Sequence, residues 1–183
     1  MRTPSLLLLL FVLFSFQRDT AATGYLSGPE KVTNLHFYMH DTVAGKDATD
    51  VPVAHGANFI PTPGTISSLF PFSSVYVFDN VLTEGWERSS RVVGNAQGMY
   101  IMSSKDGNTI DMAVDYELTE YKNSSFSVLT RNPVGDGDGR ELTVVGGRGA
   151  FRMARGFIIL PTERLNTTTL DAVIEYNVTL IHH

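Results

Sequence analysis

The chain has 183 residues, no cysteine, and a formal net charge of −5 from 14 Lys and Arg against 19 Asp and Glu. This length suits a single domain. An acidic chain without a cluster of Lys or Arg argues against binding to nucleic acid or to an anionic membrane surface. The absence of cysteine excludes thiol catalysis, cysteine-bound structural zinc and iron–sulfur clusters.

The first residues have the pattern of a secretory signal peptide. Arg2 supplies a positive start, residues 6–16 form an apolar run, and small residues follow at 20–22. The run is shorter than the about 20 apolar residues that a membrane span needs. A buried N-terminal helix is the alternative, but nothing downstream offers it an amphipathic partner. We therefore predict a signal peptide over 1–22, one domain over 23–183, and secretion.

Three sequons for N-linked glycosylation agree with secretion. Asn123, Asn166 and Asn177 are each followed two positions later by Ser or Thr. Each sequon alone is a weak signal, and use of Asn177 depends on which face of a predicted strand it occupies. We predict these three asparagines as glycosylation sites.

The rest of the chain reads as short runs rich in Val, Ile, Phe, Tyr and Thr, which suit β-strands. Clusters of Gly, Asp and Asn between the runs signal turns. Segment 42–72 contains four prolines and is expected to be a long loop with one short edge strand. About eight strands favour an antiparallel barrel or sandwich, and an eight-stranded barrel can hold one small ligand. The runs are 35–40, 74–78, 98–102, 109–118, 125–130, 142–145, 154–160 and 172–181.

The first run places a carboxylate beside an apolar row. Alternate positions give one face with Leu35, Phe37, Met39 and Asp41, and an opposite face with His, Tyr and His at 36, 38 and 40. A carboxylate at the end of such a row suits the mouth or floor of a pocket. A strand-end aspartate that caps a turn is the commoner arrangement in proteins generally.

Other chemistries have weaker signals. His36 and His40 would lie about 13 Å apart in a strand, too far for one ion, and we predict no metal site. The Gly and Asp alternation at 135–139 lacks the ligand pattern of a calcium loop and favours a hairpin tip. Residues 146–149 favour a tight turn over a phosphate cradle, because no helix follows. The sequence contains no Gly-x-Ser-x-Gly nucleophile elbow. Because carboxylates are numerous, a pair of them that hydrolyses glycosides is still an alternative.

What remains is a set of isolated polar residues in β-rich surroundings, which indicates a secreted β-barrel with an unknown small ligand. They are Asp41, Asp79, Tyr100, Arg131 and Arg140.

A series of ordered phrases resembles the plant dirigent family. The phrases run in family order from about Thr33 to His182, and the series is far more specific than any one of them. They are HD at 40–41, VFDN at 77–80, VGNAQGMY at 93–100, RNP at 131–133, RE at 140–141, VGGRGAFR at 145–152 and ARG at 154–156.

The resemblance implies an all-β fold, an eight-stranded antiparallel up-and-down β-barrel with a central ligand cavity. It also implies a homo-oligomer, a trimer or else a dimer, in the plant apoplast. Family members carry no oxidising centre, so no cofactor is expected and a separate laccase or peroxidase would make the radicals. The barrel would hold two phenoxy species in a fixed orientation and so impart stereoselectivity on their coupling, as in lignan biosynthesis.

The resemblance also suggests roles for particular residues. Asp41, Tyr100 and Arg140 match cavity residues of lignan-forming relatives and are the expected catalytic residues. Arg140 could hold a phenolic oxygen, Asp41 could protonate a quinone methide, and Tyr100 could stack on or hydrogen-bond an aromatic ring. An ordinary salt bridge is the alternative for Arg140. The further expected substrate-binding residues are Asp79, Arg131 and Phe37.

Two departures keep a second function open. Asn132 stands where lignan-forming members have an aspartate, and the terminal cysteine pair of those members is missing. The RNP phrase at 131–133 and the HFYMHD strand at 36–41 resemble instead the branch that contains pterocarpan synthase and gossypol-directing members. The alternative function is therefore a carbon–oxygen lyase that dehydrates and cyclises an isoflavonoid-type alcohol through a quinone methide. A carbohydrate-binding barrel would need a row of exposed aromatics, and Trp86 is the one tryptophan.

Overall fold

A computed structural model describes residues 28–43, 45–56, 70–161, 163–166 and 168–183. The predicted signal peptide lies outside these residues. The described part of the chain contains ten strands and two short 3-10 turns, over Val134–Asp136 and Gly149–Phe151. The strands are β1 (Lys31–Asp41), β2 (Asp50–Ala54), β3 (Val75–Thr83), β4 (Val92–Met102), β5 (Ile110–Leu118), β6 (Ser125–Asn132), β7 (Arg140–Arg148), β8 (Arg155–Leu160), β9 (Glu163–Leu165) and β10 (Ala172–His182).

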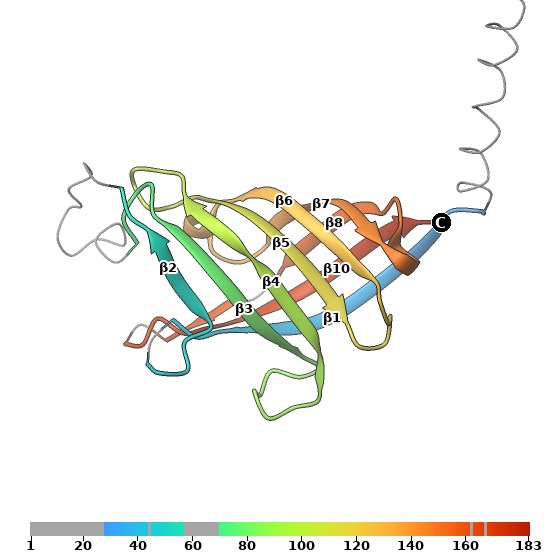
Figure 1. Cartoon of the computed structure of the whole chain (residues 1–183), viewed down its shortest axis with the longest axis horizontal. Helices are drawn as coiled ribbons and strands as arrows, with labels where there is room; N and C mark the ends of the chain where they lie inside the picture. Colours follow the sequence, from blue (N-terminus) through green and yellow to red (C-terminus); the bar gives the residue numbers. More distant parts are fainter. Residues whose placement is uncertain (1–27, 44, 57–69, 162, 167) are drawn as a thin grey trace, which may run out of the picture.

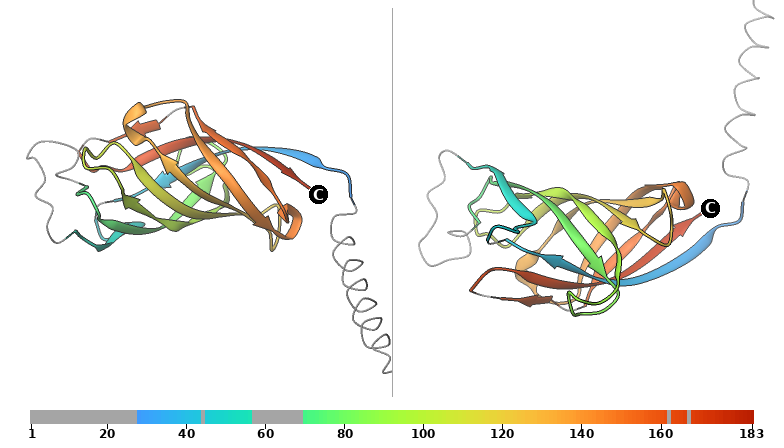
Figure 2. Two further views of the ribbon diagram at one scale, coloured as in Figure 1. Left: turned by 90° about the horizontal axis from the view of Figure 1, so that it is seen from above. Right: turned by 60° about the horizontal axis from the view of Figure 1, so that its bottom comes forward.

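Eight of these strands close into an antiparallel barrel (Figures 1 and 2). Neighbours around the ring follow the order β1, β10, β8, β7, β6, β5, β4, β3, and β3 returns to β1. The return pairing joins Tyr38 to Thr83 and His40 to Val81. The short β9 pairs with β10. The all-β, eight-stranded antiparallel barrel predicted from the sequence is confirmed.

The strand β3 has two partners on the side where the barrel closes. Its C-terminal end pairs with the end of β1, and its N-terminal half pairs with β2, where Asp50 lies opposite Phe78. The strand β2 is the short strand expected within segment 42–72, of which residues 57–69 lie outside the described part. The C-terminal end of β1 and the strand β2 therefore pair with successive parts of β3.

Alternation of apolar and polar residues decides which side chains enter the barrel. In β5, Met112, Val114 and Tyr116 are buried, whereas Asp111 and Asp115, at positions of the opposite parity, are exposed. Successive side chains of a strand point to opposite faces of the sheet, and closure makes one face the interior.

Aromatic rings fill one end of the barrel. Phe37 stacks on Tyr176 with ring centroids 5.3 Å apart, and Tyr116 stacks on Phe126 at 4.9 Å. Phe151, from the 3-10 turn after β7, packs edge-on against Phe126 at 6.1 Å. Such ring pairs add about 0.5–1.5 kcal/mol each beyond the burial of their surface. This end is a packed core.

Close contact between strands requires glycine in β8. A Cβ atom at Gly156 would lie 1.9 Å from the backbone oxygen of Thr179 on β10. The turn predicted at 146–149 is different in the structure: residues 146–148 end β7, and Gly149, at φ 63°, begins the 3-10 turn. The predicted hairpin tip at 135–139 does join β6 to β7.

The asparagines of the three sequons are all exposed. Asn123 lies between β5 and β6, Asn166 follows β9, and Asn177 points outward from β10. Their glycosylation stays a prediction. Among the described residues, no helix is long and apolar enough to cross a membrane.

Two leucines test the packing of the barrel. Leu142 on β7 is fully buried, whereas Leu129 on the neighbouring β6 is 64% exposed. We expect Leu142→Ala to lower the free energy of unfolding by about 2–5 kcal/mol, because it leaves a cavity in the core. Leu129→Ala should change it by no more than about 0.5 kcal/mol. Denaturant unfolding of both variants measures this, and equal losses would contradict the assignment of inner and outer faces.

Candidate functional site

The barrel encloses a cavity of about 210 Å³ at the end opposite the aromatic core. Most of its wall is apolar, with side chains such as Met39, Phe78, Ile110 and Leu160. Polar groups enter this wall from strands that are far apart in the sequence. A mostly apolar cavity with a few convergent polar groups is the usual form of a small-molecule site.

Three of the predicted site residues meet in this cavity. Asp41 comes from the end of β1, Tyr100 from β4 and Arg140 from the start of β7. Each occupies a position with the same parity as buried apolar neighbours on its strand, as Asp41 does with Phe37 and Met39. The structure therefore brings together the residues predicted as catalytic.

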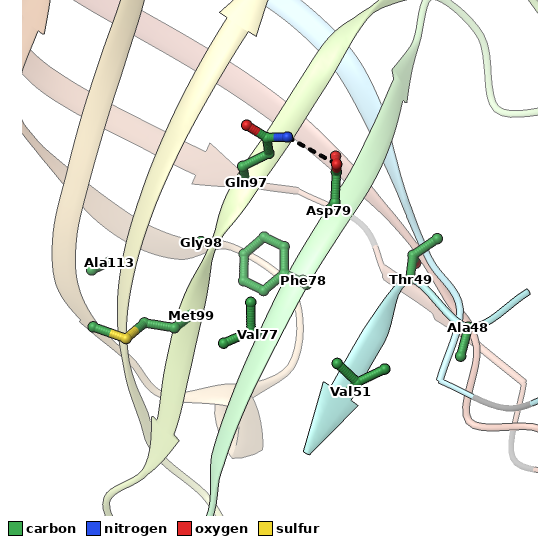
Figure 3. Close-up of a pocket in the computed structure, with 10 residues that line it drawn as sticks. All are labelled: Ala48, Thr49, Val51, Val77, Phe78, Asp79, Gln97, Gly98, Met99 and Ala113. Atoms are coloured by element: carbon green, nitrogen blue, oxygen red, sulfur yellow. Dashed lines mark hydrogen bonds between the residues drawn. The ribbon is translucent and has the colours of Figure 1, made fainter. Parts of the chain in front are cut away.

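The other three predicted residues do not line the cavity. Asp79 lies between two inward positions of β3 and is exposed, and its Oδ2 accepts a hydrogen bond of 2.8 Å from Gln97 Nε2 (Figure 3). Arg131 is exposed and donates through Nη2 to Thr109 Oγ1 at 3.3 Å. Phe37 faces inward but is part of the packed aromatic core and does not line the cavity. Asp79 and Arg131 occupy outward-facing positions of their strands, so their side chains cannot enter the cavity.

Asp79 borders a shallow groove on the outer face of the sheet. The groove crosses β2, β3 and β4, and Val51, Val77 and Met99 form much of its apolar surface (Figure 3). These three side chains are each 42–45% exposed. The groove is separated from the inner cavity by the sheet itself.

Arg140 brings a positive charge into the cavity wall. Its side chain is 5% exposed, and its Nη1 donates a hydrogen bond of 3.1 Å to Asn132 Oδ1. Asn132 is itself buried and donates to Met112 Sδ at 3.6 Å. This hydrogen bond orients the guanidinium within the cavity wall. A charged guanidinium can bind an anionic or phenolic oxygen through charge-assisted hydrogen bonds.

Sequence reasoning missed a second carboxyl in the cavity wall. Asp50, the first residue of β2, is 1% exposed, and its Oδ2 accepts a hydrogen bond of 2.7 Å from the Tyr100 hydroxyl. Its Oδ1 is also buried and has no hydrogen-bond partner among the described residues. Asp50 lies in a segment predicted as a long loop with one short strand of unspecified position. The direction of its side chain follows only once β2 is known to begin at Asp50.

Hydrogen bonds between Thr42 and the start of β2 hold the two carboxyls at the same rim of the cavity. The backbone N–H groups of Thr49 and Asp50 both donate to the carbonyl of Thr42, at 2.8 and 3.2 Å. Thr49 Oγ1 donates to the buried Asn80 Oδ1 at 2.5 Å. These hydrogen bonds thus fix the end of β1, with Asp41, beside the start of β2, with Asp50.

The apolar surroundings change the acidity of the Asp50–Tyr100 pair. Burial raises the pKa of Asp50 to about 6, against the opposing effect of the Tyr100 hydrogen bond. Burial and the negative charges of Asp50 and Asp41 raise the pKa of Tyr100, so this phenol stays protonated and acts as a donor. Tyr100 also stacks on Tyr76, with ring centroids 4.9 Å apart.

The arrangement can bind a small phenolic molecule and move protons to and from it. Carboxyl, phenol and guanidinium groups stand around a space with apolar walls, where their interactions are stronger than in water. The described residues include no group of three or more His, Asp or Glu placed to hold a metal ion.

The raised pKa of Asp50 predicts that the free energy of unfolding depends on pH. The folded state holds the proton with a pKa of about 6, against an ordinary value of 3.8, so the contribution of Asp50 to stability is fully present below about pH 4. This contribution, about 3 kcal/mol, should be lost as the pH rises from about 4 through about 6. In Asp50→Asn this loss is absent, so the variant gains stability relative to the wild type over that window.

Denaturant unfolding between pH 4 and pH 8 measures this gap, with the exposed Asp111→Asn as the control. If the difference in free energy of unfolding between Asp50→Asn and the wild type stays constant with pH, the pKa of Asp50 is not raised in the folded state.

Comparisons with known proteins identify the family of this chain. A family model described as Dirigent-like protein matches residues 32–181. Dirigent protein 15 of Arabidopsis thaliana is 45% identical over 159 residues, covering 84% of this chain and 82% of the relative. Pterocarpan synthase 1 of Glycyrrhiza echinata is 34% identical over 183 residues, covering 99% and 94%. The structure of the pterocarpan synthase dirigent protein GePTS1 superposes with a TM-score of 0.73 at 36% identity, covering 84% of this chain and 89% of that one. The chain belongs to the dirigent family.

Proposed function

We propose that this protein binds a phenolic substrate in the barrel cavity and controls the stereochemistry of a reaction that passes through a quinone methide. The observation that carries this proposal is the convergence of Asp41, Asp50, Tyr100 and Arg140 on an otherwise apolar space. Phenols offer an aromatic face for the apolar wall and an oxygen for the polar groups.

Arg140 is the proposed anchor for the phenolic oxygen. Its guanidinium lines the cavity and can favour the phenolate form of a bound phenol through charge-assisted hydrogen bonds. Electron density released from a phenolate can expel a leaving group from the benzylic carbon and so form a quinone methide. Asp41, at the cavity rim, is a carboxyl available for proton transfer in that process.

Stereochemical control requires only a fixed orientation of the reactive species. A cavity wall that holds the phenolic oxygen at one point and the ring against apolar side chains presents one face for bond formation. A preference of 20:1 corresponds to about 1.8 kcal/mol between competing transition states, since a factor of ten is about 1.4 kcal/mol. One or two hydrogen bonds made in only one orientation are sufficient.

The first candidate reaction is the dehydration and ring closure of an isoflavanol-type alcohol, by a carbon–oxygen lyase that needs no oxidant. Two observations support it. The cavity of about 210 Å³ suits one small substrate better than two, and it contains carboxyls that can donate a proton to a departing hydroxyl. The similarity to pterocarpan synthases, at 34% sequence identity, points the same way.

The second candidate is the stereoselective coupling of two phenoxy radicals supplied by a laccase or peroxidase, as in lignan formation. Asp41, Tyr100 and Arg140, which match cavity residues of lignan-forming members of the family, all line the cavity and support this candidate. In this reaction the protein would orient the radicals and guide ring closure of the quinone methide that they form.

We further propose that the protein is secreted to the apoplast, carries glycans and assembles as a homo-oligomer such as a trimer. The apolar N-terminal run and the exposed sequon asparagines at 123, 166 and 177 support the first two parts.

The experiment that separates the two reactions is chiral chromatography of products from an isoflavanol and from coniferyl alcohol, each with and without laccase. We expect ring closure of the isoflavanol without laccase. An enantiomeric excess that appears only with laccase would instead establish a coupling director. Racemic products under all four conditions would contradict the proposed function.

The role of Arg140 is tested in the same assay. Arg140→Ala should lower kcat/KM or the enantiomeric ratio at least tenfold, because the phenolic oxygen loses its cationic partner. The matched control is Arg155→Ala, which removes an exposed arginine that pairs with Glu30 on the outer surface. Equal activity of Arg140→Ala and the control would show that the phenol is anchored elsewhere.

A further inference from the structure

We propose that Asp50 is the proton donor of the cavity, with Tyr100 holding one carboxyl oxygen while the other delivers a proton to an oxygen of the bound substrate. This inference rests on the proposed function and deepens it. Asp50 would be the catalytic acid, and Tyr100 would act through it as a positioning residue.

The geometry leaves one oxygen of Asp50 for a ligand. Tyr100 occupies Oδ2 at 2.7 Å, whereas Oδ1 is buried and has no hydrogen-bond partner among the described residues. A buried polar atom without a partner costs about 1–3 kcal/mol, so native proteins rarely keep one without reason. Asp50 lines the cavity, where a substrate oxygen can become that partner.

A purely structural role explains the residue poorly. A carboxylate that stabilises a fold gathers several donors or a cationic partner, because burial of its charge is otherwise costly. Asp50 accepts a single side-chain hydrogen bond, and an asparagine could accept that bond without the cost of a charge. The carboxyl therefore lowers stability near neutral pH, as expected of a group retained for chemistry.

The surroundings of Asp50 suit a proton donor. The titratable and charged groups around it are Tyr100 from β4 and Tyr76 from β3, together with Asp41 and Arg140 in the wall of the same cavity. Burial raises the pKa of Asp50 to about 6, so a large fraction is protonated at mildly acidic pH. After the proton leaves, the hydrogen bond from Tyr100 stabilises the carboxylate.

The proton balance of the proposed dehydration closes with two carboxyls. Asp50 gives its proton to the departing hydroxyl, the carbon–oxygen bond breaks with its electron pair on oxygen, and water leaves. The phenolic O–H of the substrate passes its proton to the Asp41 carboxylate, which completes the quinone methide. The ring-closing hydroxyl then adds to the methide carbon and returns its proton to Asp50, while Asp41 reprotonates the phenolic oxygen. The net change is the loss of one water molecule.

The test is the pH dependence of kcat/KM for a 2′-hydroxyisoflavanol without oxidant, in the wild type and in Asp50→Asn. The wild type should lose about tenfold per pH unit above pH 6, because the acid must be protonated. Asp50→Asn should fall by about 10²-fold at pH 5 and lose this pH dependence. Tyr100→Phe should shift the falling limb to higher pH, because it removes the hydrogen bond that lowers the pKa of Asp50.

Matched measurements separate chemistry from folding. Asp111→Asn removes an exposed carboxyl on the outer face of β5 and should behave as the wild type. Thermal unfolding of Asp50→Asn should show a protein at least as stable as the wild type at pH 7, so lost activity cannot be assigned to unfolding.

The outcomes distinguish this inference from the function on which it rests. If the wild type is active and Asp50→Asn keeps both its rate within about threefold and the falling limb, the assignment of Asp50 is wrong while the proposed function stands. If the wild type instead directs coupling of coniferyl alcohol with laccase and does not close the isoflavanol ring, no hydroxyl departs for Asp50 to protonate, and the assignment of Asp50 is overturned while the control of stereochemistry by the barrel stands. If the wild type shows neither activity, both proposals fail together.

Discussion

The pairing of β1 with β3 is the constraint on which the rest of the structure depends, because it closes the sheet into a barrel. Closure gives every strand an inner and an outer face, and the two-residue period of a strand then assigns each side chain to one of them. The same strand β3 also pairs with β2, which carries Asp50 to the cavity rim beside Asp41. A register shift of one residue in β2 would turn Asp50 outward.

The interior of the barrel is divided between packing and binding. At one end, stacked rings such as Phe37 on Tyr176 and Tyr116 on Phe126 fill the space and give the strands a core without disulfides. At the other end, side chains such as Met39, Met112 and Tyr100 surround a cavity. The two ends belong to one closed sheet, in which each barrel strand pairs with two neighbours.

Polar groups in the cavity wall oppose the stability that the aromatic end supplies. Asp50 has one side-chain hydrogen bond for a buried carboxyl. This arrangement is costly in a medium of low polarity, and it becomes favourable when a ligand oxygen completes it. Sites that bind and transform small molecules commonly retain such groups at the expense of stability.

The sequence by itself determined the strand content, the antiparallel all-β class and, through an ordered series of motifs, the family with its cavity residues Asp41, Tyr100 and Arg140. Local patterns suffice for these, since alternation and turn residues are written along the chain. Only the tertiary structure decided that Asp79 and Arg131 face outward, that Phe37 belongs to the packed core, and that Asp50 faces the cavity. The physical reason is that the face of a side chain depends on exact strand bounds and on pairing between distant strands, and a one-residue difference reverses it.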